Sequence, residues 1–217
     1  MNRSTSPIVI AVDGPAASGK GTIARALARH YGLPHMDTGM LYRAVALTMF
    51  RFGGDPGSEF EAVRACDGVA QVDPTDDELR SEAVSSIASR ISAYPGVRAA
   101  LLQRQRNFAS GAGGAVLDGR DIGTVIAPDA TAKLFVTALP EVRARRRVAE
   151  LLARGMPSHF EDVLIDIRAR DERDSGREAA PLVRADDADL LDTSEMTIDE
   201  AIAAAINLVE ERIKARA

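Results

Sequence analysis

Short apolar runs alternate along the chain with longer segments in which apolar residues recur at helical spacing. The clearest run is Ile-Val-Ile-Ala-Val at 8–12, which leads directly into Asp13 and Gly14. Short β-branched runs of this kind predict buried strands. Similar patterns predict further strands at 34–37, 69–72, 115–118, 132–137 and 188–192.

Helical patterns fill most of the intervals between these strands. Gly32 ends the first predicted helix, Pro140 is a favourable first helical residue, and Thr197 with Glu200 has the form of a capping box. Because strands alternate with helices, the chain predicts a parallel sheet covered on both faces, which is an α/β fold. The predicted helices span 20–30, 41–52, 78–93, 97–108, 140–154, 160–173 and the segment after 197.

Composition narrows the class of protein. The 217 residues, 46% of them hydrophobic, suit a single compact domain. The net charge of −5 argues against a nucleic-acid-binding protein, and a single cysteine, Cys66, excludes an internal disulfide. No run approaches about 18 apolar residues, and residues 1–7 lack the apolar core of a signal peptide. These features predict a cytoplasmic protein without a membrane segment.

A glycine-rich loop follows the first predicted strand and precedes the first predicted helix. Gly14, Gly19 and Lys20 match the Gly-x-x-x-x-Gly-Lys pattern of the Walker A phosphate loop. Glycines let successive backbone N–H groups point at phosphate oxygens, and the helix start adds partial positive charge. Lys20 is a compact cation suited to the β- and γ-phosphates of ATP. The predicted ATP-binding residues are Gly14, Pro15, Ala16, Ala17, Ser18, Gly19, Lys20, Gly21 and Thr22.

The residue after the lysine is Gly21, and the hydroxyl group comes one position later, at Thr22. GTPases and motor ATPases place Ser or Thr directly after the lysine, where it binds Mg²⁺. The Gly-Lys-Gly-Thr form instead resembles nucleoside monophosphate kinases. It leaves open whether Thr22 would meet Mg²⁺ directly or through water.

Five further segments suggest an acceptor for the phosphate. They are Asp-Thr-Gly-Met-Leu-Tyr-Arg at 37–43, Tyr-Pro-Gly-Val-Arg at 94–98, Leu-Asp-Gly-Arg-Asp-Ile-Gly-Thr at 117–124, Arg-Ala-Arg-Asp-Glu-Arg-Asp at 168–174 with Arg177, and Ala-Pro-Leu at 180–182. In this order and spacing they resemble bacterial cytidylate kinases nearly end to end. Adenylate kinases differ in the third segment, where an aromatic residue and Pro-Arg follow Asp-Gly.

The resemblance implies a P-loop NTPase three-layer sandwich with a central parallel sheet, a helical lid and a reduced insertion that binds the nucleoside monophosphate. All of 1–217 would form one nucleoside monophosphate kinase domain. Its core would comprise 7–52, 95–155 and 186–217, its insertion about 53–94, and its lid about 156–185. The stretch at 69–80 is too short for the extra hairpin that many bacterial cytidylate kinases carry in this insertion.

The resemblance also implies roles for particular residues. By position, the cytosine readers would be Asp121, Arg98 and Thr38. The clamp on the CMP phosphate would be Arg43 with Arg170. The contacts to the sugar hydroxyls would be Asp174 and Ser89, and Arg177 completes the predicted CMP-binding set.

The predicted catalytic residues are cations around the transferring phosphoryl group. They are Lys20, Arg170 and the lid arginines Arg146, Arg173 and Arg177. Thr22 and Asp118 would serve Mg²⁺, Asp118 from the outer shell. The implied activity is ATP:CMP or dCMP phosphotransfer by a monomer that needs Mg²⁺, with small nucleotides as its ligands.

Three other functions stay open at this point. Another small P-loop kinase could act on UMP, AMP or a metabolite such as shikimate, although Asp121 with Arg98 favours cytosine. A GTPase-like switch or a nucleic-acid-associated ATPase is less favoured, because the chain has no Asn-Lys-x-Asp motif and no basic stripe. A nucleotide-binding module without catalysis is disfavoured by Lys20, Asp118 and the lid arginines.

Overall fold

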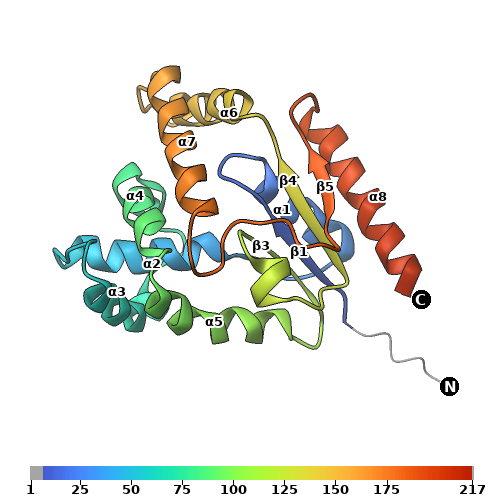
Figure 1. Cartoon of the computed structure of the whole chain (residues 1–217), viewed down its shortest axis with the longest axis horizontal. Helices are drawn as coiled ribbons and strands as arrows, with labels where there is room; N and C mark the ends of the chain where they lie inside the picture. Colours follow the sequence, from blue (N-terminus) through green and yellow to red (C-terminus); the bar gives the residue numbers. More distant parts are fainter. Residues whose placement is uncertain (1–6, 217) are drawn as a thin grey trace. The chain divides into compact units, whose positions relative to one another are not determined.

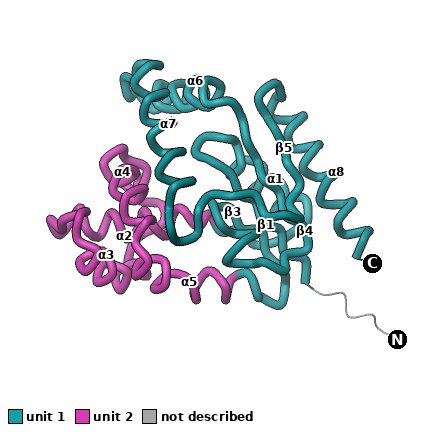
Figure 2. The backbone as a smooth tube through the Cα atoms, in the orientation of Figure 1, with its two compact units in different colours: residues 1–36, 109–217 teal, residues 37–108 magenta. Residues whose placement is uncertain are grey.

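The computed structural model describes residues 7–216. They form two compact units, shown in teal and magenta in Figure 2. Unit 1 contains the chain up to Met36 and again from Ala109 onward, and unit 2 is Asp37–Phe108. The insertion predicted at 53–94 lies within unit 2.

A parallel sheet lies at the centre of unit 1 (Figure 1). Its strands are β1 (Val9–Asp13), β2 (His35–Asp37), β3 (Ala115–Gly119), β4 (Ala132–Thr137) and β5 (Asp189–Asp192), in the order β2-β3-β1-β4-β5. In the register of the sheet, Val12 of β1 lies between Asp118 and Leu134. The predicted α/β fold of P-loop type, with a central parallel sheet flanked by helices, is confirmed.

Two helices of unit 1 cover one face of this sheet. They are α1 (Lys20–Tyr31) and α8 (Ile198–Arg216). Ile23 and Leu27 of α1, with Val209 of α8, pack on Ile10 and Leu134 of the strands. Burying these apolar side chains supplies most of the driving force for the sheet–helix packing.

Helices α6 (Pro140–Ala153) and α7 (Phe160–Ser175) form a separate packed pair in unit 1. Leu151, Val163 and Ile167 are buried between them. The predicted lid at 156–185 therefore contains α7, followed by a segment with turns and bends but no helix or strand.

Unit 2 is built from helices throughout Thr38–Phe108. They are α2 (Thr38–Arg51), α3 (Glu59–Ala65), 3₁₀ turns at Cys66–Gln71 and Asp77–Arg80, α4 (Glu82–Ile91) and α5 (Pro95–Ala109). The last residue of α5, Ala109, belongs to unit 1. Leu47, Val84 and Ile91 are fully buried at its centre.

One predicted element has the wrong type, and two elements were not predicted. The strand predicted at 69–72 is part of a 3₁₀ turn, because Val69 is buried against the core of unit 2 rather than paired in a sheet. Helix α3 was not predicted; Ser58 caps it by accepting a hydrogen bond from the backbone N–H of Glu61. A π-helix at Ile122–Ile126 was also not predicted. Within 7–216, no helix is long and apolar enough to span a bilayer.

The buried centre of unit 2 generates a test of the packing. Replacing Leu47, which is fully buried, with Ala should lower the free energy of unfolding by about 2–5 kcal/mol, because a cavity remains. Urea unfolding followed by circular dichroism measures the change. Phe52 is 85% exposed, so Phe52→Ala is the control, and equal losses in the two variants would contradict this packing.

Candidate active site

The phosphate loop joins β1 to α1 in a backbone conformation that requires glycine at its first position. Gly14 has φ 151°, and a Cβ built on it would lie 2.0 Å from the carbonyl oxygen of Val136 in β4. No side chain fits at that distance. Ala17 has a left-handed φ of 57°, and its methyl group packs against the α6–α7 cluster.

The start of α1 faces this loop. Gly19, with φ 88°, is the N-cap residue and gives no side-chain cap, and its carbonyl accepts from the N–H groups of Thr22 at 3.0 Å and Ile23 at 3.1 Å. The start of a helix carries partial positive charge, which favours an anion there. Lys20 Nζ donates to the carbonyl of Pro15 at 3.2 Å, which places its ammonium beside the first residues of the loop. The hydroxyl of Ser18 is fully buried, and no described group hydrogen-bonds to its Oγ.

Arg146 of α6 is held against the loop. Its Nη1 donates to Thr193 Oγ1 at 2.9 Å and its Nη2 to the carbonyl of Thr193 at 2.6 Å. Thr193 is itself buried and donates to the carbonyl of Ser18 at 3.1 Å. The structure therefore places this predicted catalytic arginine next to the phosphate loop.

A second arginine ties α7 to the same loop. Arg143 is buried and makes a two-pronged ion pair with Asp171, at 3.0 and 2.6 Å. It also donates to the carbonyl of Ala16 at 3.3 Å. Asp171 lies between the predicted catalytic residues Arg170 and Arg173 in sequence, and Arg173 is exposed on α7. The packing of Arg143 thus fixes the helix that carries both.

The residues predicted to serve Mg²⁺ lie close to the helix start. Asp118 is buried at the end of β3, and its Oδ1 accepts a hydrogen bond from His35 Nε2 at 2.7 Å. A Cβ built on Gly21 would lie 3.5 Å from Asp118 Oδ2. The hydroxyl of Thr22 accepts from Arg25 Nη2 at 3.4 Å. A carboxylate and a hydroxyl are hard oxygen donors of the kind that Mg²⁺ takes, so these residue types fit the ion.

Three arginines surround the buried carboxylate of Asp174, and two of them, Arg170 and Arg177, are predicted site residues. Asp174 Oδ2 accepts from Arg120 Nε at 2.7 Å, and Asp174 Oδ1 lies 3.5 Å from Arg177 Nη2. Burial alone would raise the pKa of Asp174, but the charges of Arg120, Arg177 and Arg170 outweigh it and lower that pKa. Asp174 is therefore an anion at neutral pH. Asp121 follows Arg120 directly in the chain.

Unit 2 carries the other predicted acceptor residues. Arg43 of α2 donates to Ser85 Oγ at 2.7 Å and to the carbonyl of Leu79 at 2.9 Å. Ser89 is buried one helical turn after Ser85 on α4. Arg98 donates to the carbonyl of Ser92 at 3.2 Å, and its guanidinium lies 6.0 Å from the ring centre of Tyr42. Thr38 is buried at the start of α2.

Several residues beside the predicted ones were missed from the sequence. Arg120 and Tyr42 lie inside motifs that were singled out, so adjacency to Asp121 and Arg43 was a usable signal. Thr193 follows β5 at the carboxyl edge of the sheet, where ligands bind in open α/β folds. Arg143 carried no signal, because arginine is common throughout the chain.

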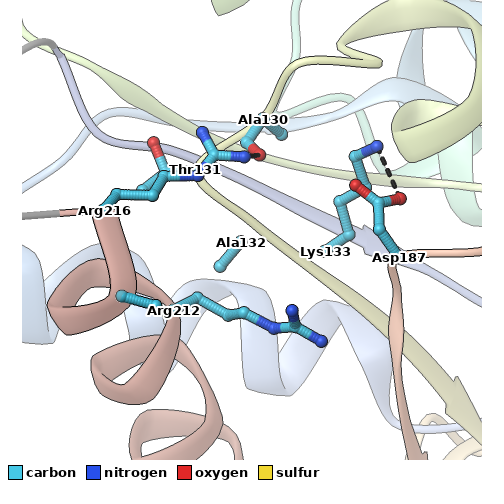
Figure 3. Close-up of a pocket in the computed structure, with 8 residues that line it drawn as sticks. Ala130, Thr131, Ala132, Lys133, Asp187, Arg212 and Arg216 are labelled. Atoms are coloured by element: carbon cyan, nitrogen blue, oxygen red, sulfur yellow. Dashed lines mark hydrogen bonds and ion pairs between the residues drawn. The ribbon is translucent and has the colours of Figure 1, made fainter.

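A small pocket of about 140 Å³ lies at the other end of β4 (Figure 3). Lys133, Arg212 and Arg216 line it, and each cation is already engaged. Lys133 pairs with Asp187 at 2.8 Å, Arg212 pairs with Asp189, and Arg216 donates to backbone carbonyls. Since β4 begins here and the phosphate loop lies where the parallel strands end, we assign the pocket no part in nucleotide binding.

Asp13, the last residue of β1, has an unusual titration. Its pKa is raised to about 6. Burial is the main cause and nearby Asp121 adds to it, while backbone hydrogen bonds from Gly123 and Ile122 and the charge of Arg120 act against the rise. A carboxyl whose pKa is raised on folding stabilises the protein below its unfolded pKa, and this stability is lost as the pH rises through the folded pKa.

We therefore expect the stability of the wild type to fall, through this group, as the pH rises from about 4 to about 7. Asp13→Asn removes the titration, so its free energy of unfolding relative to wild type should increase by about 3 kcal/mol over that range. Urea unfolding at a series of pH values measures the difference. Parallel pH profiles of the two proteins would contradict the assignment.

Comparison with known proteins agrees with this arrangement. The family model for cytidylate kinase matches residues 10–211. Cytidylate kinase from Xanthobacter autotrophicus is 60% identical over 207 residues, which cover 94% of this chain and 98% of that protein. The enzyme of the same name from Azorhizobium caulinodans is 57% identical over 205 residues, with the same two coverages.

Among solved structures, an uncharacterized protein from Eubacterium ventriosum superposes with a TM-score of 0.56 at 14% identity, over 94% of this chain and 98% of that one. This likeness concerns the fold alone. The family model and the identities of 60% and 57% decide the family. The predicted resemblance is confirmed, and the chain belongs to the cytidylate kinase family.

Proposed function

We propose that the chain transfers the γ-phosphate of ATP to CMP or dCMP, giving ADP and CDP or dCDP. The observation that carries the proposal is the phosphate loop, with its glycine conformations, the start of α1 directly after it and Lys20 Nζ beside its first residues. Its membership of the cytidylate kinase family supplies the class of acceptor. We expect a monomer in the cytoplasm.

The charges of the reactants decide what the residues must do. The attacking group is a phosphate oxygen that is already ionised at neutral pH, so no general base is needed. Two anions must approach each other while negative charge moves onto the ADP leaving group. Catalysis then rests on positioning and on fixed positive charge. Lys20, Arg146, Arg170, Arg173 and Arg177 would supply that charge.

Thr22 and Asp118 would hold Mg²⁺, directly or through water. When bound, the ion supplies electrostatic neutralisation of the phosphate oxygens. His35 fixes one oxygen of Asp118 by its hydrogen bond, which leaves the other oxygen directed at Gly21. Gly21 thus gives the carboxylate access to the start of α1, where other P-loop proteins carry a hydroxyl.

Recognition of the acceptor divides between base, sugar and phosphate. Asp121 would accept from the exocyclic amine of cytosine, and a carboxylate there disfavours uracil, which presents a carbonyl. Arg98 and Thr38 would complete the reading of the base.

The remaining acceptor residues follow from their charge and hydrogen-bonding capacity. Asp174, ionised because arginines surround it, would accept from a sugar hydroxyl, with Ser89 as a second contact. Arg43 and Arg170 would clamp the phosphate, since a guanidinium matches two oxygens at once.

An acceptor panel tests the proposal. The protein is assayed with ATP and Mg²⁺ against CMP, dCMP, UMP and AMP, and ADP release is measured with a coupled assay. We expect the highest kcat/KM for CMP or dCMP, because Asp121 discriminates by hydrogen-bond polarity. Better turnover of UMP or AMP, or ATP hydrolysis that does not depend on an acceptor, would refute it.

The base-reading role of Asp121 has its own test. Asp121→Asn should lower the preference for CMP over UMP by about tenfold or more, since a charged hydrogen bond is lost. The KM for ATP should stay near that of the wild type. Asp129→Asn, at an exposed position in the turn that follows, is the matched control, and unchanged selectivity in Asp121→Asn would count against the role.

A further inference from the structure

The side chain of Asp13 joins two segments that lie 109 positions apart in the chain. Its Oδ1 accepts from the backbone N–H of Ile122 at 2.8 Å, and its Oδ2 accepts from that of Gly123 at 2.7 Å. Only a carboxylate can accept at both places, because a side-chain amide of the same shape offers one oxygen and one NH₂ donor. Asp13 is 6% exposed, so both hydrogen bonds are shielded from water.

These two N–H groups belong to the first turn of the π-helix that begins at Ile122, where no earlier turn provides acceptors. Asp121 is the N-cap residue of this helix and gives it no side-chain cap. Its carbonyl accepts from the N–H groups of Val125 at 2.9 Å and Ile126 at 3.2 Å. The carbonyl of Asp121 is therefore bonded within the helix that follows it, and the next two backbone N–H groups are bonded to the carboxylate of Asp13. Together these bonds fix the backbone at Asp121.

Packing leaves this turn little freedom to move. A Cβ built on Gly123 would lie 3.1 Å from Cδ of Lys133 and 3.3 Å from Oδ2 of Asp13, which is tighter than ordinary contact. On its other side, Asp13 precedes Gly14, whose backbone is fixed against the carbonyl of Val136. The side chain of Asp13 thus connects the start of the phosphate loop to the turn that carries Asp121.

The charge at position 13 is not explained by stability alone. Burial raises the pKa of Asp13, and repulsion from the nearby carboxylate of Asp121 adds to the rise. A neutral residue would avoid both costs but would lose one of the two acceptors. The presence of a carboxylate indicates that the geometry of the turn requires both hydrogen bonds.

We propose that Asp13 is a positioning residue for the acceptor nucleotide, because it sets the place of Asp121 relative to the phosphate loop. The inference rests on the proposed reading of the acceptor base by Asp121. In this role Asp13 would contact neither the phosphate nor the base and would act through the backbone of Ile122 and Gly123.

The test is Asp13→Asn in the full chain, with KM measured separately for ATP and for the acceptor that the wild type prefers. We expect the acceptor KM to rise by about tenfold or more, while the KM for ATP changes by no more than about twofold. Selectivity between CMP and UMP should fall as well. A purely structural role would lower the amount of active enzyme without splitting the two KM values.

Two further variants keep the test decisive. Asp189→Asn removes a carboxylate that pairs with Arg212 at 2.6–2.7 Å elsewhere in unit 1, and it should leave both KM values unchanged. Gly123→Ala keeps the carboxylate of Asp13 but places a methyl group against its Oδ2, which disturbs the hydrogen bond from the backbone of residue 123. It should raise the acceptor KM as well, and it serves as the test if Asp13→Asn does not fold. Unchanged acceptor KM and selectivity in the variant that folds would overturn the inference.

Failure of the proposed function would appear in the acceptor preference of the wild type. A wild type that prefers an acceptor other than a cytidine nucleotide contradicts the proposed function by itself. The ratio of the two KM values, measured with that preferred acceptor, still decides whether Asp13 positions it.

Discussion

The approach of Gly14 to the carbonyl of Val136 is the constraint on which the phosphate loop depends. The backbone leaves β1 so close to β4 that a Cβ would lie 2.0 Å from that oxygen. Only glycine allows this path, and the path brings the chain over the carboxyl edge of the sheet into the start of α1. The start of α1, with its partial positive charge, therefore follows directly after the loop. Position and charge for a phosphate therefore follow from one steric condition in the sheet.

The arginines around the loop are held in place by acceptors of the protein itself. Arg143 is paired with Asp171, Arg146 with the backbone and hydroxyl of Thr193, and Arg120 with Asp174. Buried charges are tolerated only when they are paired and hydrogen-bonded. The same pairing fixes each guanidinium in advance, which is what electrostatic stabilisation of a reacting phosphate requires.

Local features were predictable from the sequence and distant contacts were not. The strand at 8–12 and the loop after it were recognised because apolar run, glycines and lysine are contiguous. The 3₁₀ turn at Cys66–Gln71 was mistaken for a strand, since Val69, Ala70 and Val72 give a short stretch rich in β-branched and apolar residues. Only the burial of Val69 in unit 2 decides the conformation. The hydrogen bonds of Asp13 with Ile122 and Gly123 join residues that are separated in the sequence by all of unit 2. No local sequence pattern indicates them.

Two buried carboxylates of unit 1 show how the surroundings select a chemical role. Asp174 is surrounded by guanidiniums, which outweigh the effect of burial, lower its pKa and keep it charged at neutral pH. Asp13 is held mainly by neutral backbone amides and lies near another carboxylate, so burial dominates and its pKa rises to about 6. A carboxylate that is costly to ionise is poorly suited to contact a ligand. Its two oxygens can still accept hydrogen bonds from two backbone N–H groups at once. In the proposed function, the carboxylate of Asp174 would bind the ligand and that of Asp13 would fix the backbone geometry.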